Sequence, residues 1–192
     1  AAYPNPKRTI LVGHWGAEEQ GLIGSRAFAE DHKEVVDGLQ AAFNQDNGTG
    51  RISSISPGPF AQGGAVLSRY MSEMPSEVTQ WVRLGGTSAF GGPGGTDHTT
   101  FVCHKAPGIG TGALGWDYSN TSWHTNRDTF DKIVPEDLRN NATFIAMLAY
   151  MASEDPQKFP RELVPQGNLP DGTPRPWPAC PGATKSAAAS AR

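Results

Sequence analysis

The chain has 192 residues and a formal net charge of -3, with 16 Lys and Arg against 19 Asp and Glu. Its length suits one globular domain with a buried core. Because the basic residues are scattered and the balance is slightly acidic, we expect neither nucleic acid nor an anionic membrane surface as a partner. No window of about 20 apolar residues is available to cross a bilayer, so a membrane span is not expected either.

The first half of the chain alternates β-type runs with amphipathic segments. The run Arg8-Thr9-Ile10-Leu11-Val12 has the character of a short buried strand. The turn sequence Asp46-Asn47-Gly48 closes a second strand. Altogether we expect strands at 8–12, 39–44 and 51–55, and helices at 22–32 and 64–74.

The second half repeats this alternation with longer loops. A glycine-rich loop at 84–95 precedes a short helix for which Thr96 is a plausible N-cap. A long loop at 117–133 precedes the last helix, which begins with Pro135 in its first turn and carries an apolar face. The expected strands lie at 78–84 and 109–114, and the expected helices at 96–104 and 135–155.

Two regions follow from these patterns. Residues 1–155 form an α/β unit, in which sites lie in loops at the carboxyl ends of the strands. Residues 156–192 form a proline-rich extension, too rich in proline for a packed element, and a tail that we expect to be disordered. Cys103 and Cys180 are the two cysteines, and their spacing leaves a disulfide and two free thiols equally open.

Candidate site residues follow the predicted strands or lie in the long loop. Glu18 and Glu19 are adjacent carboxylates, which repel each other unless a cation lies nearby. With Asp46 and His124 they offer carboxylate and imidazole groups, which zinc accepts in catalytic sites that keep one position open. Successive side chains diverge, so one glutamate would bind the metal while the other accepts a proton from water as a general base.

Four motifs, "AEEQGLIGS", "FNQDNGTG", "GTDHTTF" and "WHTNRDT", occur in this order and together resemble one family. They look like the zinc-dependent peptidases that include secreted bacterial leucyl aminopeptidases, carboxypeptidase Q and glutamate carboxypeptidase II. The resemblance runs from about residue 8 to residue 151, and it implies a three-layer sandwich whose mixed central sheet is flanked by helices, a phosphorylase/hydrolase-like α/β fold.

The resemblance implies a role for each motif residue. Glu18 would be the general base, Glu19 and His124 would bind one zinc ion, and Asp46 would bind the other. Supporting or substrate-facing roles fall to Asp97, His98, Asp128 and Tyr118. Most also have a structural interpretation: a solvated loop pair or first-turn helix acids for the glutamates, a helix-start acid for Asp97, and a turn residue for Asp46. His124 would be an ordinary hydrogen-bonded loop histidine, and Asp128 would cap a turn.

This sequence departs from the family pattern at its N-terminal end. Family members place an HxD motif and a metal-bridging Asp upstream of the glutamate pair, and we expect the chain to be the C-terminal part of such an enzyme, with the N-terminal portion of the fold missing. It would bind metal weakly alone, have little activity on its peptide substrate, and associate with the missing half or with itself through an exposed sheet edge. Relatives are mostly exported, so a periplasmic or extracellular location is implied.

Two other functions fit the same motifs. A glutaminyl-cyclase-like acyl transferase belongs to a related group that keeps a single zinc ion. A binding module of the same fold would have lost its metal ligands, whereas Glu18, Glu19, Asp46 and His124 are all retained here. A metallopeptidase is therefore the function we expect.

Overall fold

The fold is a three-layer α/β sandwich around a small mixed sheet. The computed structural model describes residues 5–46 and 48–182. Four strands make the sheet in the order β1-β4-β2-β3. Strand β1 is parallel to β4 and β3 is parallel to β2, whereas β2 and β4 are antiparallel. The strands are β1 (Ala42–Asn44), β2 (Ile52–Ser56), β3 (Arg83–Leu84) and β4 (Gly108–Ala113).

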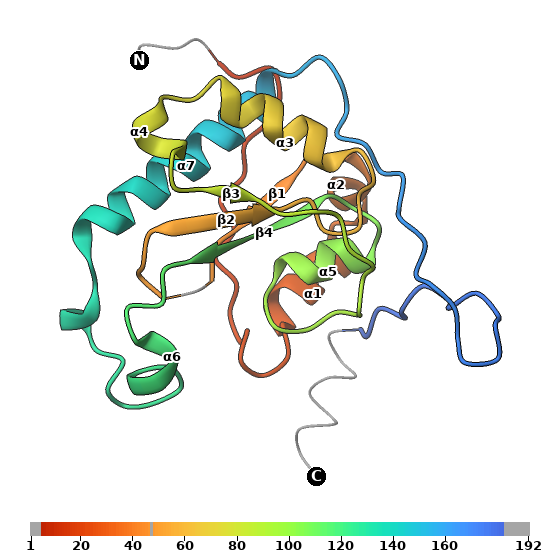
Figure 1. Ribbon diagram of the computed structural model, residues 1–192. Coiled ribbons are helices and arrows are strands. Elements are labelled where there is room, and N and C mark those ends of the chain that lie inside the picture. The colour runs from red at the N-terminus through yellow and green to blue at the C-terminus, as the bar shows by residue number, and fades with distance from the viewer. Residues whose placement is uncertain (1–4, 47, 183–192) are drawn as a thin grey trace.

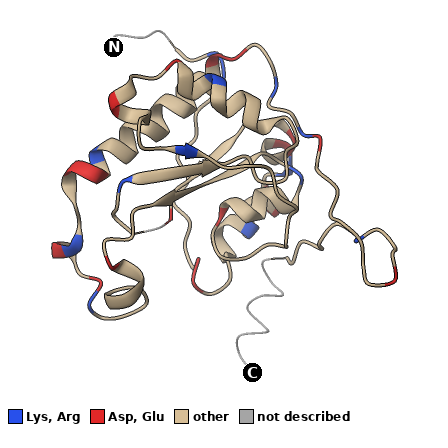
Figure 2. Cartoon of the chain, in the orientation of Figure 1, with Lys and Arg blue, Asp and Glu red and all other residues tan. Residues whose placement is uncertain are grey.

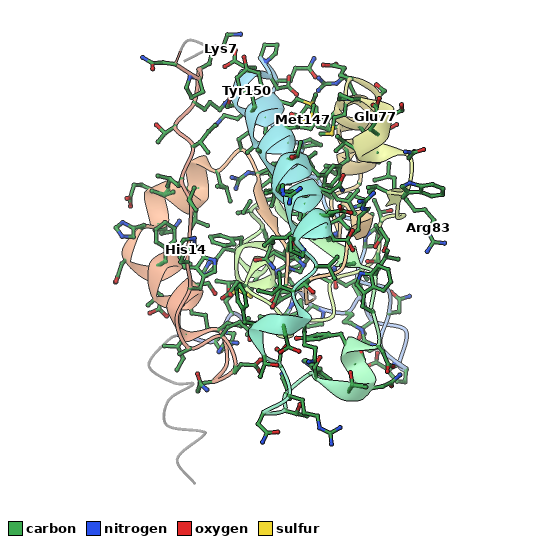
Figure 3. All side chains as sticks on the ribbon, turned by 90° about the vertical axis from the view of Figure 1, so that its left-hand side faces the viewer. Lys7, His14, Glu77, Arg83, Met147 and Tyr150 are labelled. Atoms are coloured by element: carbon green, nitrogen blue, oxygen red, sulfur yellow. A yellow bond between two sulfur atoms is a disulfide. The ribbon has the colours of Figure 1, made fainter. Side chains whose placement is uncertain are left out.

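Helices cover both faces of this sheet (Figure 1). The long helix α7 (Pro135–Glu154) lies on one face with α3 (Gly63–Ser72) and α4 (Ser76–Thr79), while α1 (Ile23–Asp31) and α5 (His98–Cys103) lie on the other. In the view of Figure 3, α7 runs down the middle of the picture, with Met147 and Tyr150 labelled on the helix. Shorter helical segments are α2 (Lys33–Gly38), α6 (Tyr118–Thr121) and a 3-10 turn, η1 (Phe130–Lys132).

The main core lies between the sheet and α7. Ile52 and Ile55 of β2 pack with Phe144 and Leu148 of α7, and all four are at most 1% exposed. These residues are spaced three apart on the strand and four apart on the helix, so the bulge in β2 is needed to turn both isoleucines to the same side. A second, smaller cluster joins α1 and α2 to α5 on the opposite face.

Two polar side chains of α7 hold the start of β2. Asn141 is 1% exposed, accepts a hydrogen bond from the Ile52 amide at 2.7 Å, and donates to the Gly50 carbonyl at 2.9 Å. One turn earlier, Asp137 accepts bonds from the Arg51 amide at 3.0 Å and the Trp116 indole at 2.8 Å. Where the bulge interrupts strand pairing, helix side chains therefore satisfy the backbone.

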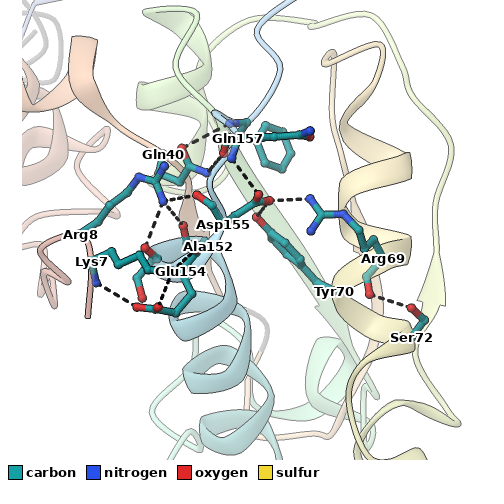
Figure 4. Close-up of polar contacts among 12 residues, drawn as sticks. Lys7, Arg8, Gln40, Arg69, Tyr70, Ser72, Ala152, Glu154, Asp155 and Gln157 are labelled. Carbon is teal, nitrogen blue, oxygen red and sulfur yellow. Dashed lines mark hydrogen bonds and ion pairs between the residues drawn. The ribbon is translucent and has the colours of Figure 1, made fainter. Parts of the chain in front are cut away.

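The end of α7 ties the two chain ends to the core (Figure 4). A guanidinium nitrogen of Arg8 donates to the carbonyls of Ala152 and Ser153 at 3.2 and 3.1 Å. The Tyr70 hydroxyl donates to Asp155 at 2.7 Å, and Arg69 forms an ion pair with the same carboxylate. The amide side chain of Gln40 donates to the Gln157 carbonyl at 2.8 Å.

The described part of the C-terminal extension packs against the body without regular secondary structure. Phe159 is 3% exposed and meets Phe60 edge to face. Further along, Trp177 stacks on Phe90 of the glycine-rich loop with ring centres 5.1 Å apart. Cys103 and Cys180 form a disulfide. As expected for a proline-rich segment, residues 156–182 form no helix or strand, but large apolar side chains and a covalent link attach them to the body.

Several predicted elements need correction. Residues 8–12 form no strand, and Ile10, Leu11 and Val12 are 44%, 62% and 82% exposed. Residues 78–84 form the end of α4 and the two-residue β3 rather than one strand. The N-cap of α5 is Asp97 instead of Thr96. The predicted tail at 183–192, and Asn47 of the predicted turn, lie outside the described residues.

The other predicted elements agree in type and differ at their ends. α1, α3, α5 and α7 correspond to the four predicted helices, and β1, β2 and β4 to three of the predicted strands. The α2 helix and the helical turns within 117–133 were not predicted. The expected α/β fold with a mixed sheet flanked by helices is confirmed, and within the described residues no helix is long and apolar enough to traverse a bilayer.

Candidate functional site

The turn that carries Glu18 and Glu19 contains backbone conformations with positive φ, which few residue types adopt. Ala17 and Leu22 have φ of 56° and 61°, and Gly21 has φ of 103°. The carbonyl of Glu18 accepts bonds from the Gly21 and Leu22 amides at 2.9 and 2.8 Å. This compact turn places both carboxylates immediately before α1.

His124 lies next to this turn in space, although it is far from the turn in the sequence. It follows α6 and has φ of 57°, and its Nε2 atom lies 2.9 Å from Oε1 of Glu19. The Trp123 ring lies against the imidazole with centroids 4.2 Å apart. The side chains of His124 and Glu19 are 52% and 61% exposed, so both remain open to a ligand.

A cavity of about 620 Å³ joins these residues. Glu18, Glu19, Asp46 and His124 line it, together with Tyr118 at the start of α6. Asp46 reaches it from the carboxyl end of β1, where an α/β sheet commonly presents its sites. The structure thus gathers the four residues expected at the site, and their individual roles stay predictions.

Crowded carboxylates set the electrostatics of the cavity. Partial burial raises the pKa of Glu18, and the negative charges of Asp46, Glu19 and Asp97 raise it further, while His124 opposes them. The pKa of Tyr118 is raised by burial and by Asp128, Asp46 and Glu19. In Figure 2, red segments of the cartoon, which mark Asp and Glu, lie in the loops next to α1 and α6. An excess of negative charge in a cleft attracts cations.

The remaining predicted residues lie around the cavity. Asp97 is 6% exposed and its Oδ1 atom has no hydrogen-bond partner; burial and the charge of Asp46 raise its pKa, although a hydrogen bond from Ser25 lowers it. The ring of His98 fills the space where Gly110 lacks a side chain, and it lines a neighbouring cavity of about 400 Å³. Asp128 is exposed and acts on Tyr118 by charge.

Two kinds of site residue were not predicted. Gly94, Gly95 and Gly112 line the cavity with backbone, and a glycine-rich composition indicates only flexibility. Arg26 also lines it, although it lies inside a helix whose sequence pattern suggests an ordinary polar position. The spacing of Arg26 four residues after Leu22, a buried residue, was the available signal.

The donor set fits zinc. Two ligands about 2.0 Å from a tetrahedral zinc ion lie roughly 3.3 Å apart, and the Glu19 oxygen and the His124 nitrogen are 2.9 Å apart before any ion draws them around itself. Within residues 5–46 and 48–182, no group of three or more His, Cys, Asp or Glu side chains converges closely enough to enclose an ion. Glu19 and His124 therefore form a pair with the donor types and the spacing of zinc ligands, with Asp46 on the same cavity wall.

Comparisons with known proteins agree with this geometry. A model of peptidase family M28 matches residues 1–149. Carboxypeptidase Q of Bos taurus is 26% identical over 158 residues, covering 81% of this chain and 31% of that protein. Probable glutamate carboxypeptidase LAMP1 of Arabidopsis thaliana is 32% identical over 125 residues, covering 54% of this chain and 17% of that protein.

A solved structure has the same fold. The crystal structure of a peptidase M28 precursor from Shewanella amazonensis SB2B superposes with a TM-score of 0.64 at 27% identity, covering 79% of this chain and 32% of that one. The chain spans about a third of the length of the carboxypeptidase Q relatives. The family match covers most of the chain, the fold agrees, and Glu18, Glu19, Asp46 and His124 line one cavity. The chain belongs to peptidase family M28.

Proposed function

We propose that the protein is a zinc-dependent exopeptidase that hydrolyses peptide bonds of small peptides. The observation that carries this proposal is the position of Glu18 beside the Glu19–His124 pair in a single cavity. The cavity volume of about 620 Å³ falls in the range of small-molecule sites. The similarity to carboxypeptidase Q supports a carboxypeptidase activity in particular.

Each residue has a role in the proposal. Glu19 and His124 would hold one zinc ion, and Asp46 would take part in binding a second. Bound zinc would supply a water molecule of lowered pKa and positive charge to stabilise the oxyanion. Glu18 would accept the proton of the attacking water and then deliver it to the leaving amine, a role suited to a carboxyl whose pKa is raised.

The proposed metal ligands of this chain are too few to complete a two-metal site. A two-metal site needs a group that bridges its ions, and Glu19, Asp46 and His124 leave that position to a group beyond them. We propose that another part of the natural protein, or a second copy of the chain, supplies it. On this proposal the chain alone binds metal weakly and turns over peptides slowly.

The disulfide supports a location for the protein. Disulfides such as Cys103–Cys180 persist in oxidising compartments. We propose a periplasmic or extracellular location on this basis.

A substitution at Glu18 tests the catalytic proposal in the full natural protein. Glu18→Gln is expected to lower turnover of dipeptide and tripeptide substrates by about 10²- to 10⁴-fold, with bound zinc per molecule unchanged. Glu136→Gln, at an exposed position in the first turn of α7, removes the same charge away from the cavity and should leave turnover unchanged. Unimpaired hydrolysis by Glu18→Gln, or cyclisation of glutaminyl peptides in place of hydrolysis, would contradict the proposal.

A further inference from the structure

The glycine-rich loop at 84–95 forms part of the wall of both cavities. Gly94 and Gly95 line the cavity of about 620 Å³ that contains the glutamate pair, and Phe90 lines the neighbouring cavity of about 400 Å³. Gly112 of β4 lines both cavities, so the two are adjacent. The position of this loop therefore sets how wide the candidate site is.

The loop has few means of holding its own position. Six of its residues are glycine, and residues 85–95 form no helix or strand. After Leu84 of β3, Phe90 is its only large apolar side chain, and this side chain is buried, with the residue 8% exposed. Glycine loses more conformational freedom on folding than any other residue. The ordered position of the loop therefore depends on how Phe90 packs.

Phe90 packs against a C-terminal strap, which we define as residues 175–182. The rings of Phe90 and Trp177 are stacked, with centres 5.1 Å apart and an angle of 25° between their planes. Aromatic rings in such an arrangement attract each other beyond the effect of the area that they bury. The strap also passes close to Gly92, where a Cβ atom would be 3.8 Å from Pro178. The strap therefore holds the loop from outside.

Cys103, the last residue of α5, anchors the strap in two ways. Its carbonyl accepts a hydrogen bond from the Trp177 indole nitrogen at 2.8 Å, and its side chain forms the disulfide with Cys180. In addition, the Nζ atom of Lys105 lies 5.9 Å from the centre of the Trp177 ring, within the range of a cation–π contact. The indole is thus fixed to the end of α5 while its ring contacts Phe90.

We propose that Trp177 is a positioning residue that holds the glycine-rich loop in place as a wall of the substrate cavity. Trp177 itself is not among the described residues that line either cavity, so it acts through Phe90. The strap follows residues 1–149, the part of the chain that matches family M28. Its effect on peptide binding rests on the proposed function, whereas its effect on the loop does not.

Amide hydrogen exchange of the 192-residue chain tests the loop directly, without catalysis. Trp177→Ala should speed exchange in the peptide 85–95 by about 10²-fold or more, the scale on which removal of a packed Trp side chain shifts a local equilibrium. Exchange in a peptide from the middle of α7 should not change. Trp177→Phe keeps an aromatic ring and should restore most of the protection. Trp81→Ala removes a tryptophan that is 65% exposed and should leave both peptides unchanged.

Peptide hydrolysis by the full natural protein loaded with zinc tests the consequence for the site. Trp177→Ala should raise KM for dipeptides and tripeptides by about 3- to 10-fold, because substrate binds only the fraction of molecules whose loop is in place. The kcat and the zinc content should stay within about twofold of the wild type, since Trp177 acts on binding and not on the chemical step. Trp177→Phe should recover most of the wild-type KM.

Three results would overturn the role of Trp177. The first is unchanged exchange of the loop in Trp177→Ala. The second is exchange that speeds up equally in the loop and in α7, which would make Trp177 a stabiliser of the whole domain. The third is a lowered kcat at unchanged KM, which would assign it to the chemical step. If the full natural protein hydrolyses no peptide, the proposed function fails, and the exchange measurement alone decides the role of Trp177.

Discussion

His98 should make the stability of the protein depend on pH in the mildly acidic range. Burial lowers the pKa of its imidazole from 6.5 to about 4, although the charge of Asp46 opposes the change. The ring lies against β4, where a Cβ on Gly110 would be 2.7 Å from Nε2. Its Nδ1 atom is buried without a partner. A protonated ring in this place would therefore lack both water and a hydrogen-bond acceptor.

The sign and size of the effect follow from linkage. Above pH 6.5 the imidazole is neutral in both the folded and the unfolded chain, and the folded state loses nothing. As pH falls toward about 4, the unfolded chain takes up a proton that the folded chain cannot, so the free energy of unfolding decreases. The interval between the two pKa values corresponds to about 3 kcal/mol at its full extent.

Urea unfolding of the metal-free protein at pH 7.5, 5.5 and 4 measures this difference. His98→Phe keeps an aromatic ring and removes the titration, so its free energy of unfolding should fall less than that of the wild type by about 3 kcal/mol between pH 7.5 and 4. Other groups, such as Asp97, titrate in both proteins and cancel in the comparison. His104→Phe, at an exposed position, is the matched control. Parallel pH profiles for wild type and His98→Phe would refute the reasoning.

Two further predictions concern stability. Asn141→Leu leaves the Ile52 amide and the Gly50 carbonyl without their side-chain partner and should lower the free energy of unfolding by about 2–5 kcal/mol, measured by urea unfolding. The control Asn140→Leu should lower it much less, because the Asn140 amide nitrogen has no partner. Equal losses in the two variants would contradict the proposed role of Asn141 in holding β2. Replacing Cys103 and Cys180 together by serine removes the disulfide that closes a loop of 77 residues. The free energy of unfolding should fall by about 4 kcal/mol in the same assay. An unchanged midpoint would indicate that Phe159 and Trp177 hold the extension without the disulfide.

Local sequence pattern was sufficient for elements whose partners lie in this chain. The apolar residues of α7 recur at helical spacing, and Phe144 and Leu148 are fully buried against β2 as that spacing predicts. Strands β2 and β4 were predicted from short apolar runs, and both find neighbours in the sheet. Where periodicity and packing agree, the element type can be read from the sequence.

The apolar run at 8–12 shows why pattern alone is not sufficient. Its residues favour a strand, but a strand also needs a neighbour with free hydrogen-bonding groups, and within the described residues this segment has none. Residues 78–84 differ for a related reason. Only Arg83 and Leu84 pair with β2, and the preceding residues close a helical turn beside α7.

The residue types of the candidate site could be predicted from the sequence, but their arrangement in space could not. The glutamate pair, the aspartate after β1 and the late histidine could be named from residue type, order and family resemblance. That Glu19 and His124, 105 residues apart, lie 2.9 Å from each other was decided by the fold. Arg26 is the clearest case of what sequence reasoning missed, because its charge is common on a helix surface and only tertiary packing buries it in the cavity.

The sequence by itself determined the family, the order of most elements and the kinds of group available for catalysis, since these depend on residue identity and local periodicity. The tertiary structure alone decided which side chains are in contact and which charged groups are buried. It also decided how the proline-rich extension attaches through Phe159, Trp177 and the disulfide. Those outcomes depend on contacts between residues far apart in the chain, whose free energy no local pattern contains.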